Sequence, residues 1–310
     1  MLVLSCDGKG IVMRADALRP ATAAAAATTT PKLATRLSKG EKRNRKPMAE
    51  VGTVYDATPT VRTPADILPA GDDGAQPAPG PITTNKWLVA SVVDNAASVV
   101  AQIFTEAQRR DPTHTRTPVA LVDGNNHQIN RITAEAHARD VPVTIIIDFI
   151  HVLEYLWKAA WSFHPEADPA AETWVRRHAA TILAGNPTRV ARSIRRQATK
   201  AALTPAQRAG ADTCANYLTN KAPHLDYPTA LQRGWPIATG VIEGACRHLV
   251  KDRMDITGAR WGLPGTEAIL KLRAVRSNGD LDAYWTYHLA QERHRVHQSR
   301  YANNAIPQAA

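Results

Sequence analysis

Two short apolar runs in the middle of the chain constrain its fold more than any other feature. Residues 119–122 and 143–147 are rich in β-branched side chains, and each run stops at an aspartate, Asp123 and Asp148. Runs of this length and composition predict buried strands. Residues 128–139 between them carry apolar side chains at helical spacing. The unit is therefore predicted to be strand, helix, strand, and such a crossover makes the two strands parallel.

Parallel strands bring their C-terminal tips to the same edge of a sheet. We therefore expect Asp123 and Asp148 to lie together at that edge, which is where open α/β sheets bind ligands and metals. This predicts an α/β fold class with a candidate site built from strand-tip acids.

The length of 310 residues allows one catalytic domain with an insertion, or two small domains. No stretch of eighteen residues is continuously apolar, and Asp7 interrupts the first apolar run, so neither a membrane span nor a signal peptide is predicted. We expect a cytoplasmic protein associated with the nucleoid. The three cysteines are odd in number and lack CxxC spacing, which argues against a disulfide framework and a cysteine zinc site.

The charge balance points to an anionic partner. The formal net charge is +10 and the isoelectric point is about 9.7. An excess of this size favours a polyanion, most simply nucleic acid, although many basic proteins bind none.

The N-terminal half alternates between β-runs and long polar segments. Residues 1–13 predict a hairpin whose first strand ends at Asp7 and whose turn is Gly-Lys-Gly. Residues 15–50 form a basic excursion, residues 51–55 a third strand, residues 57–86 a loop rich in proline and glycine, and residues 95–110 a helix.

The C-terminal half is predicted to be helical. Residues 152–163, 170–183, 187–202, 205–218, 236–250, 265–276 and 280–300 each suit a helix. Residues 188–200 place five cations on successive turns, which predicts a basic face or an ordinary solvated helix. In 236–250 we expect Thr239 to cap the first turn, and Gly240 and Gly244 to permit close approach of another backbone.

Four acids are candidates for chemistry. Asp123, Asp148 and Glu243 lie beside strongly apolar elements, where an unpaired carboxylate is costly, and Asp7 shares the strand-tip position. Carboxylates gathered at one edge repel each other, and a divalent cation such as Mg²⁺ removes that penalty. Local alternatives are that Asp7 only makes a turn and that Glu243 only pairs with Arg247 one helical turn away.

The order of these elements resembles a known enzyme superfamily. The first strand with Asp7, the strand tips Asp123 and Asp148, a helical insertion and Glu243 on a late helix resemble a DDE-type transposase with an RNase H-like core. The blocks LVDGNNHQI, IIIDFIHVLEYLWKAAW, GWPIATGVIEGACRHLVKDRMDITGARW and LKLRAVRSNGD are similar to bacterial insertion-sequence transposases of the ISKra type, over essentially the whole chain.

This resemblance implies roles for individual residues. Asp7, Asp123 and Glu243 would be the catalytic, metal-binding triad, holding two Mg²⁺ ions with Mn²⁺ as a substitute. Asp148 and His151 match the family's Asp-x-x-His signature and would support the site, while the residues alone leave Asp148 open as a metal ligand. His151 could equally be a core histidine bonded to Asp148 or to the backbone.

The resemblance also implies a reaction and partners. Water would cut a 3′ phosphodiester at the transposon end, and the freed 3′-hydroxyl would attack target DNA. We expect double-stranded DNA as partner, a homodimer in the synaptic complex and no membrane association. Trp235 is a further candidate for stacking on bases. Residues expected to contact DNA are Lys42, Arg43, Arg45, Lys46, Arg247, Lys251, Arg253, Arg260 and Trp261.

The implied architecture is an RNase H-like mixed sheet flanked by helices, with an all-helical insertion before the late catalytic helix. The core would comprise 1–160 and 235–277, the insertion 161–234, and a C-terminal helix and tail 278–310. Relatives carry a substantial N-terminal region before the first catalytic strand, so we expect that this chain lacks it, as a truncated copy would, and binds transposon ends poorly.

Two other functions share the same acids. One is an RNase H-like nuclease without strand transfer, and the other is a catalytically inactive DNA-binding remnant. A zinc hydrolase is disfavoured because the histidines show no HExxH or comparable ligand set.

Overall fold

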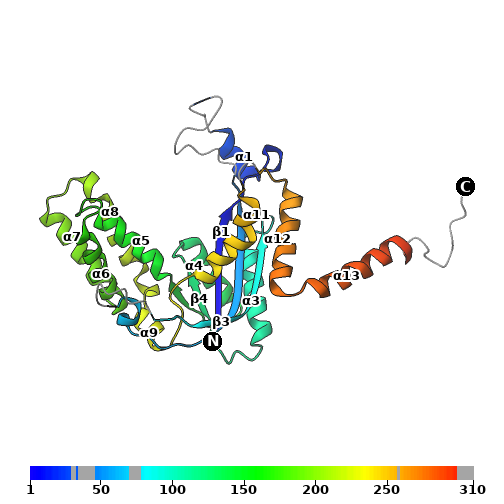
Figure 1. Cartoon of the computed structure of the whole chain (residues 1–310), viewed down its shortest axis with the longest axis horizontal. Coiled ribbons are helices and arrows are strands. Elements are labelled where there is room, and N and C mark those ends of the chain that lie inside the picture. The colour runs from blue at the N-terminus through cyan, green and yellow to red at the C-terminus, as the bar shows by residue number, and fades with distance from the viewer. Residues whose placement is uncertain (29–32, 34–45, 70–77, 257–258, 299–310) are drawn as a thin grey trace, which may run out of the picture.

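A mixed sheet of five strands lies at the centre of the residues described by the computed structural model, 1–28, 33, 46–69, 78–256 and 259–298 (Figure 1). The strand order is β3-β2-β1-β4-β5. Strands β1, β2 and β3 pair antiparallel, whereas β4 runs parallel to both β1 and β5. The strands are β1 (Leu2–Gly10), β2 (Met48–Thr58), β3 (Ile82–Ser91), β4 (Val119–Val122) and β5 (Thr144–Ile147).

Helices make up most of the remaining described chain. Those before the fifth strand are α1 (Pro20–Ala27), α2 (Pro64–Ile67), α3 (Ala96–Arg110) and α4 (Asn126–Ala138). Those of the middle region are α5 (Phe149–Ala160), α6 (Pro169–Leu183), α7 (Pro187–Lys200), α8 (Pro205–Lys221) and α9 (Tyr227–Gln232). The last are α10 (Gly240–Ala245), the π-helical turn η3 (Cys246–Lys251), α11 (Asp252–Met254), α12 (Leu263–Asn278), α13 (Leu281–Arg293) and the π-helical turn η4 (His294–Gln298). None of these helices is both long and apolar enough to cross a membrane.

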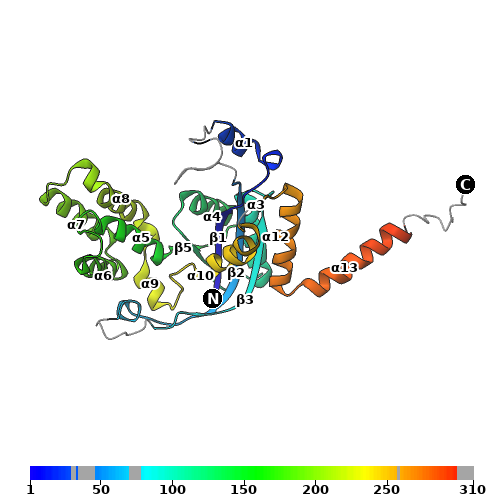
Figure 2. The ribbon, with the colours of Figure 1, turned by 45° about the horizontal axis from the view of Figure 1, so that its top comes forward.

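Helices cover both faces of the sheet. On one face, α3 packs so closely on β2 that a Cβ built at Gly52 would lie 2.7 Å from Ile103 Cδ1. On the other face, α10 lies against β1 and β2 (Figure 2). Val51 of β2 belongs there to a second core cluster with Ile242 and Leu249 of α10 and η3. Successive residues of a strand point to opposite faces, so the sheet separates the two cores, and β2 and β3 contribute to both.

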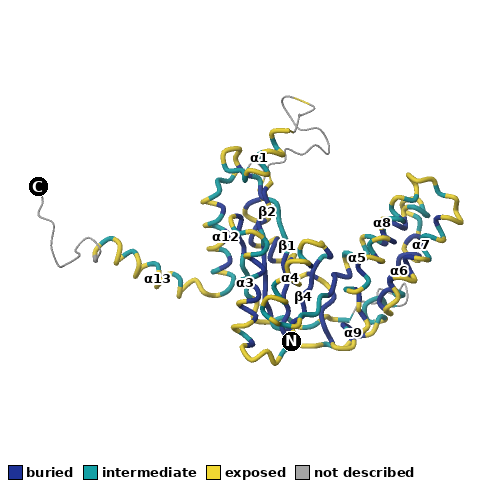
Figure 3. The backbone as a smooth tube through the Cα atoms, turned by 180° about the vertical axis from the view of Figure 1, so that it is seen from behind, coloured by how far each residue is buried: buried dark blue, intermediate teal, exposed yellow. Residues whose placement is uncertain are grey.

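The helical insertion α6–α9 is joined to the main core through α5. Leu156 of α5, Val175 of α6 and Leu218 of α8 are buried in the same cluster as the strands β1, β4 and β5. In contrast, α13 contains no buried residue and extends away from the rest of the described chain (Figure 3).

The predicted hairpin at residues 1–13 is wrong. Strand β1 continues through Gly8-Lys9-Gly10 without turning, because residues 7–10 pair with the first four residues of β2, from Asp7 with Val51 to Gly10 with Met48. The expected strand 51–55 is the middle of that longer β2. Asp7 therefore lies within a strand and does not serve to make a turn.

A strand was missed in the sequence. β3 begins inside the segment 57–86 that we expected to be a loop, and α2 forms a short helix within it. The first half of β3 is largely exposed and contains Asn85 with a positive φ of 50°, so neither an apolar run nor strict alternation marks it. Edge strands bury little surface, which leaves a weak sequence signal.

The helix predicted at 236–250 begins later and changes its winding. The Ile237 carbonyl accepts a hydrogen bond from the Phe149 amide at 2.8 Å, which holds this segment extended, and α10 starts at Gly240 before the π-helical turn. Thr239 makes no side-chain cap. Apart from the neighbouring residues and backbone of their own helix, no described atom lies within 4 Å of a Cβ built at Gly240 or Gly244, so the expected close approach of another backbone is absent from the described chain.

The remaining predicted helices are confirmed within a few residues. Those expected at 95–110, 128–139, 152–163, 170–183, 187–202, 205–218 and 265–276 correspond to α3, α4, α5, α6, α7, α8 and α12. The helix expected at 280–300 is α13 followed by η4, and its last residues lie outside the described chain.

The segment after β2 is fastened to the segment that leads into α10. The Thr60 amide donates to the Gly234 carbonyl at 3.1 Å, and the Arg62 guanidinium donates to the Trp235 carbonyl at 2.7 Å. Gly234 has φ +70°, and a Cβ there would lie 2.4 Å from the Thr60 nitrogen. Only glycine adopts this conformation at this distance without strain.

We expect Gly234→Ala to destabilise the protein by about 2 kcal/mol or more, because it combines an unfavourable φ with a clash against backbone. Denaturant unfolding of the variant and of Gly279→Ala measures this. Gly279 also has a positive φ, of 83°, but open space around its Cβ position. Gly279→Ala therefore measures the loss of stability due to the backbone conformation alone. Equal losses in the two variants would contradict the contribution of the clash.

Candidate active site

Three aspartates occupy matching positions on three adjacent parallel strands, β1, β4 and β5. Val3 and Leu4 of β1 pair with Val119 and Ala120 of β4, and the same offset continued along the strands brings Asp7 opposite Asp123. β4 and β5 are also in register to their ends, which brings Asp123 opposite Asp148. The Asp148 amide still donates to the Val122 carbonyl at 2.8 Å, so the pairing continues past the strand tips.

The register thus places Asp7, Asp123 and Asp148 in one row, which we call the aspartate row. Neighbouring strands lie about 4.8 Å apart, so the row spans roughly 10 Å. The expectation that Asp123 and Asp148 share one edge is confirmed for the backbone, and Asp7 joins them from within β1.

Asp7 is half-buried and faces the helices that carry Glu243. Its Oδ1 accepts from the Gly8 amide at 2.7 Å, and its Oδ2 accepts from the Cys246 thiol at 3.5 Å. Burial raises the pKa of the Asp7 carboxyl; the two hydrogen bonds oppose this rise, and the nearby charge of Asp123 adds to it.

Asp148 is almost fully buried, with 2% of its surface exposed. Its Oδ1 caps α5 by accepting from the Ile150 amide at 2.9 Å, and its Oδ2 accepts from the Thr239 hydroxyl at 2.7 Å. Burial raises the pKa of the Asp148 carboxyl, the Thr239 and Ile150 donors lower it, and Glu243 raises it further. The Asp148 carboxyl therefore ionises less readily than that of an ordinary aspartate.

Thr239 links Asp148 to Glu243. Its hydroxyl oxygen lies 2.7 Å from Asp148 Oδ2 and 2.9 Å from Glu243 Oε1. A hydroxyl has a single hydrogen to donate, so both contacts are hydrogen bonds at once only when one of the two carboxyls is protonated and donates. The three groups form a chain of polar contacts from the sheet edge to the late helix.

The late helix, formed by α10 and η3, crosses the aspartate row. Thr239 contacts Asp148 at one end of the row, and Cys246 contacts Asp7 at the other. Seven residues of helix rise about 10 Å, which equals the span of the row. Glu243, exposed and between these two contacts, is therefore brought over the row from a segment about 120 residues after Asp123.

His151 does not bond to Asp148. Its Nδ1 lies 3.3 Å from Glu154 Oε2, and its ring packs edge-on against Tyr155 and Tyr217, with centroid separations of 5.5 Å and 6.2 Å. Asp148 and His151 are thus neighbours on the first turn of α5 without a direct contact.

Several side chains beside the row were not singled out in the sequence. Lys221 is a buried residue whose ammonium donates to Asn126 Oδ1; burial lowers the pKa of Lys221 and the charge of Asp123 opposes that fall. Tyr217 stacks on Tyr155 and places its hydroxyl 3.4 Å from the Asp123 carbonyl. These two come from α8, in the insertion, and no local pattern relates them to the acids. Thr239 was singled out in the sequence only as a helix cap; its position one helical turn before Glu243 was the signal for its contact with that acid.

Four of the eight cations expected to contact DNA lie on the segment after Glu243. Lys251 and Arg260 are exposed, and Arg253 lies over the Trp261 ring at 5.7 Å. Arg247 pairs with Asp252 at 3.6 Å, so its expected alternative pairing with Glu243 is not formed.

The N-terminal basic cluster is described only in part. Lys46 pairs with Asp255 at 3.2 Å, which ties it to the segment after Glu243. Lys42, Arg43 and Arg45 lie outside the described residues.

The two tryptophans differ in accessibility. Trp235 is buried in the main core, so it is not available to stack on bases. Trp261 is half-buried, donates from Nε1 to the Met254 carbonyl at 3.2 Å and packs against the second core cluster.

The acids suit a hard cation by their chemistry but are not gathered to hold one. Within the described chain no carboxylate of the aspartate row, nor Glu243, has a lysine or arginine partner at ion-pair distance. Yet among the same residues no group of three His, Cys, Asp or Glu side chains is placed to hold a metal ion. The carboxylates interact as two pairs, Asp7 with Asp123 and Asp148 with Glu243.

Comparisons with known proteins add nothing to this geometry. A scan against protein-family models and searches of curated proteins and of solved structures found no match.

We expect Asp148→Asn to stabilise the protein at neutral pH. An acid with a raised pKa in the folded state loses stability as pH rises through that pKa, and asparagine keeps the α5 cap without the charge. A gain of about 1 kcal/mol would raise Tm by roughly 2–4 °C in a chain of this size. Thermal unfolding between pH 4 and pH 8 measures this, and the gain should shrink at acid pH.

The matched control is Asp168→Asn. Asp168 caps α6 through the same kind of bond, from the Ala170 amide at 2.9 Å, at a less buried position. A lower Tm for Asp148→Asn than for wild type at pH 8 would contradict the assignment of a destabilising charge.

Proposed function

We propose that this chain is a DNA transposase with an RNase H-like core, which cuts a 3′ phosphodiester at the end of a mobile element and joins the freed 3′-hydroxyl to target DNA. Asp7, Asp123 and Glu243 are its catalytic acids, supported by Asp148 and His151. Double-stranded DNA is the substrate, and the working form is a homodimer that holds two DNA ends. The proposed location is the nucleoid.

One observation carries this proposal. The register of β1, β4 and β5 aligns three aspartates, and a helix more than 90 residues after the last of them brings Glu243 over that row. Antiparallel β1–β3 followed by parallel β4 and β5 supports the RNase H-like assignment of the sheet.

The acids require that positive charge enters the site together with the DNA. A phosphodiester is an anion and is repelled by a row of carboxylates, so positive charge has to be supplied with it. Magnesium, or manganese in its place, would supply that charge and polarise the phosphate when bound. Holding it with Asp7, Asp123 and Glu243 requires a side-chain arrangement different from the two pairs described above.

The exposed side of the late helix leaves room for a strand of DNA. Gly240 and Gly244 flank Glu243, are exposed and have no described atom near their Cβ positions. Gly244, inside the helix, costs about 1 kcal/mol relative to alanine, and no packing within the described protein accounts for either glycine. A backbone that approaches from outside would account for both, and Lys251 and Arg253 follow on the same segment.

A second candidate is a DNA-binding remnant without activity. It is favoured by the lack, within the described residues, of three side chains placed to hold a metal. A nuclease that cuts without joining shares all of the acids and is the third candidate.

We expect Asp123→Asn to reduce magnesium-dependent nicking of supercoiled plasmid by roughly 10²–10³-fold, the range for removing one group that stabilises charge at a reacting centre. The assay follows conversion to open circles on a gel. Asp140→Asn is the matched control, since Asp140 is exposed and follows α4 away from the row. Wild-type protein that binds DNA but never nicks it would support the inactive remnant and defeat the proposal.

A joining assay with the same protein distinguishes a transposase from a nuclease. Labelled duplexes with a free 3′-hydroxyl are incubated with plasmid, and covalently joined product is sought. Nicking without joined product, over a set of end sequences, would favour the nuclease.

We expect Thr239→Val to lower nicking by about 10–100-fold, the range found when a residue that orients a reactive group is lost. Valine keeps the shape of threonine and removes the hydroxyl that contacts Asp148 and Glu243. Thr239→Ser retains the hydroxyl and should restore activity, and the pH profile of Thr239→Val should shift. Equal rates for the valine and serine variants would exclude a positioning role.

A further inference from the structure

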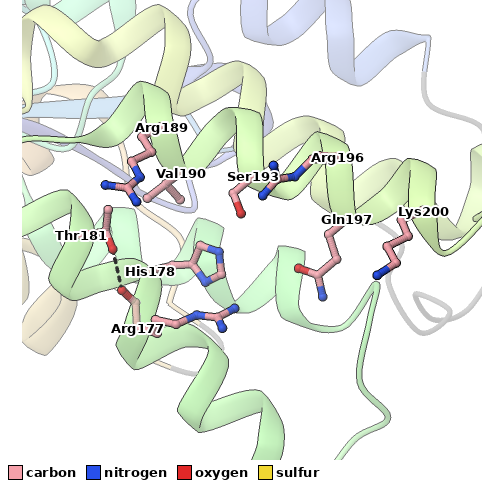
Figure 4. A pocket seen from close by; sticks show the side chains of 9 residues that line it. All are labelled: Arg177, His178, Thr181, Arg189, Val190, Ser193, Arg196, Gln197 and Lys200. Carbon is pink, nitrogen blue, oxygen red and sulfur yellow. Dashed lines mark hydrogen bonds between the residues drawn. The ribbon is translucent and has the colours of Figure 1, made fainter.

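A strongly basic hollow lies between α6 and α7, apart from the aspartate row (Figure 4). Its volume is about 700 Å³. It is lined by Arg177, His178, Thr181, Arg189, Val190, Ser193, Arg196, Gln197 and Lys200. Nothing in the proposed chemistry of the acids uses this hollow.

The charge of the hollow is not balanced by the protein. Four of its side chains are permanent cations, and no carboxylate is among its described lining residues. Within the described chain Arg177, Arg189, Arg196 and Lys200 have no ion pair and no side-chain hydrogen bond. Other arginines of the same helices are engaged: Arg195 donates to Asn216, and Arg176 to the Pro69 carbonyl. Like charges held together without a counter-charge favour an anionic ligand.

The floor of the hollow is held in place by buried groups. The His178 ring is buried, bonds through Nδ1 to the Trp174 carbonyl at 2.8 Å and packs on the Trp174 ring with centroids 4.0 Å apart. The Trp174 indole in turn donates to Gln197 Oε1 at 2.9 Å. This bond fixes the amide of Gln197, so its NH₂ group is left as a donor for a ligand.

The spacing of the cations indicates the size of the anion. Arg189, Arg196 and Lys200 lie on one stripe of α7, which spans eleven residues or about 16 Å. Phosphates recur about every 3.4 Å of axis along one strand of DNA, so the stripe matches several successive phosphates. A single phosphate ion would engage only part of it.

We propose that this hollow binds the sugar–phosphate backbone of DNA without reading its sequence, as a second contact surface in the helical insertion. Arginine forks pair with phosphate oxygens in a bidentate manner, and the Gln197 amide adds a neutral donor. The inference concerns a surface separate from the acids, and it holds whether or not the acids cut DNA.

Anisotropy of a labelled duplex of mixed sequence, bound by the full chain over a range of NaCl concentrations, tests this. Each phosphate contact contributes about 0.9 to the slope of log K against log salt. We expect Arg196→Gln to lower the slope by about one and Arg189→Gln/Arg196→Gln by about two. Lys200→Gln provides an independent variant, and unfolding curves verify that each variant is folded.

Arg192→Gln is the matched control, because Arg192 is exposed on the same helix but does not line the hollow. Its slope should remain that of wild type. The anisotropy is measured without added divalent cation, so it reports binding alone, and failure of this inference is distinguished from failure of the proposed activity. The inference is overturned if the double variant keeps the wild-type slope or matches Arg192→Gln. It is also overturned if millimolar inorganic phosphate, at fixed ionic strength, removes the whole difference between wild type and double variant.

Discussion

The parallel register of β1, β4 and β5 is the constraint on which the rest of this site depends. Side chains in register on neighbouring parallel strands lie on the same face, so three aspartates are forced to be neighbours. Burial raises the pKa of Asp7 and of Asp148, and a nearby negative charge adds to each rise, that of Asp123 at Asp7 and that of Glu243 at Asp148. The apolar surface buried by β4 and by the first half of β1 offsets this cost.

The late helix completes this arrangement and is held against the sheet by the second core cluster. Thr239 and Cys246 touch the two ends of the aspartate row, and the extended segment before α10 is held by the Ile237 carbonyl. The exposed glycines beside Glu243 keep its outer side open. The structure therefore combines a fixed set of acids on the sheet with a glutamate whose surroundings remain accessible.

The positive charge of the protein has a complementary distribution. Cations follow Glu243 on the segment of η3 and α11, and a second group lines the hollow between α6 and α7. The aspartate row itself has no lysine or arginine at ion-pair distance in the described chain, although Lys9 acts electrostatically on Asp7 and buried Lys221 on Asp123. A negatively charged site beside positively charged surfaces suits a long anion such as DNA. The surfaces attract its backbone, and additional positive charge is needed only at the phosphate that reacts.

Much of this protein could be predicted from its sequence, because local patterns carried the information. The strands before Asp123 and Asp148 were recognisable because each is a short β-branched run. The helices were recognisable because each buries one apolar face at a regular spacing. The length of β1 and the existence of β3 were not, because both depend on pairing with β2, and the exposed half of an edge strand has no apolar pattern. The start of α10 was misplaced for the same reason: a hydrogen bond from Phe149 decides it.

The sequence by itself thus determined the two parallel strands, the identities of the candidate acids and the basic stripe of α7. Only the tertiary structure decided that Asp7 lies within a strand beside Asp123, that Thr239 joins Asp148 to Glu243, and that Lys221 lies near the row. The reason is physical: strand identity and helix faces follow from the spacing of neighbouring residues, whereas strand register and the contacts of one side chain are set by partners distant in the chain.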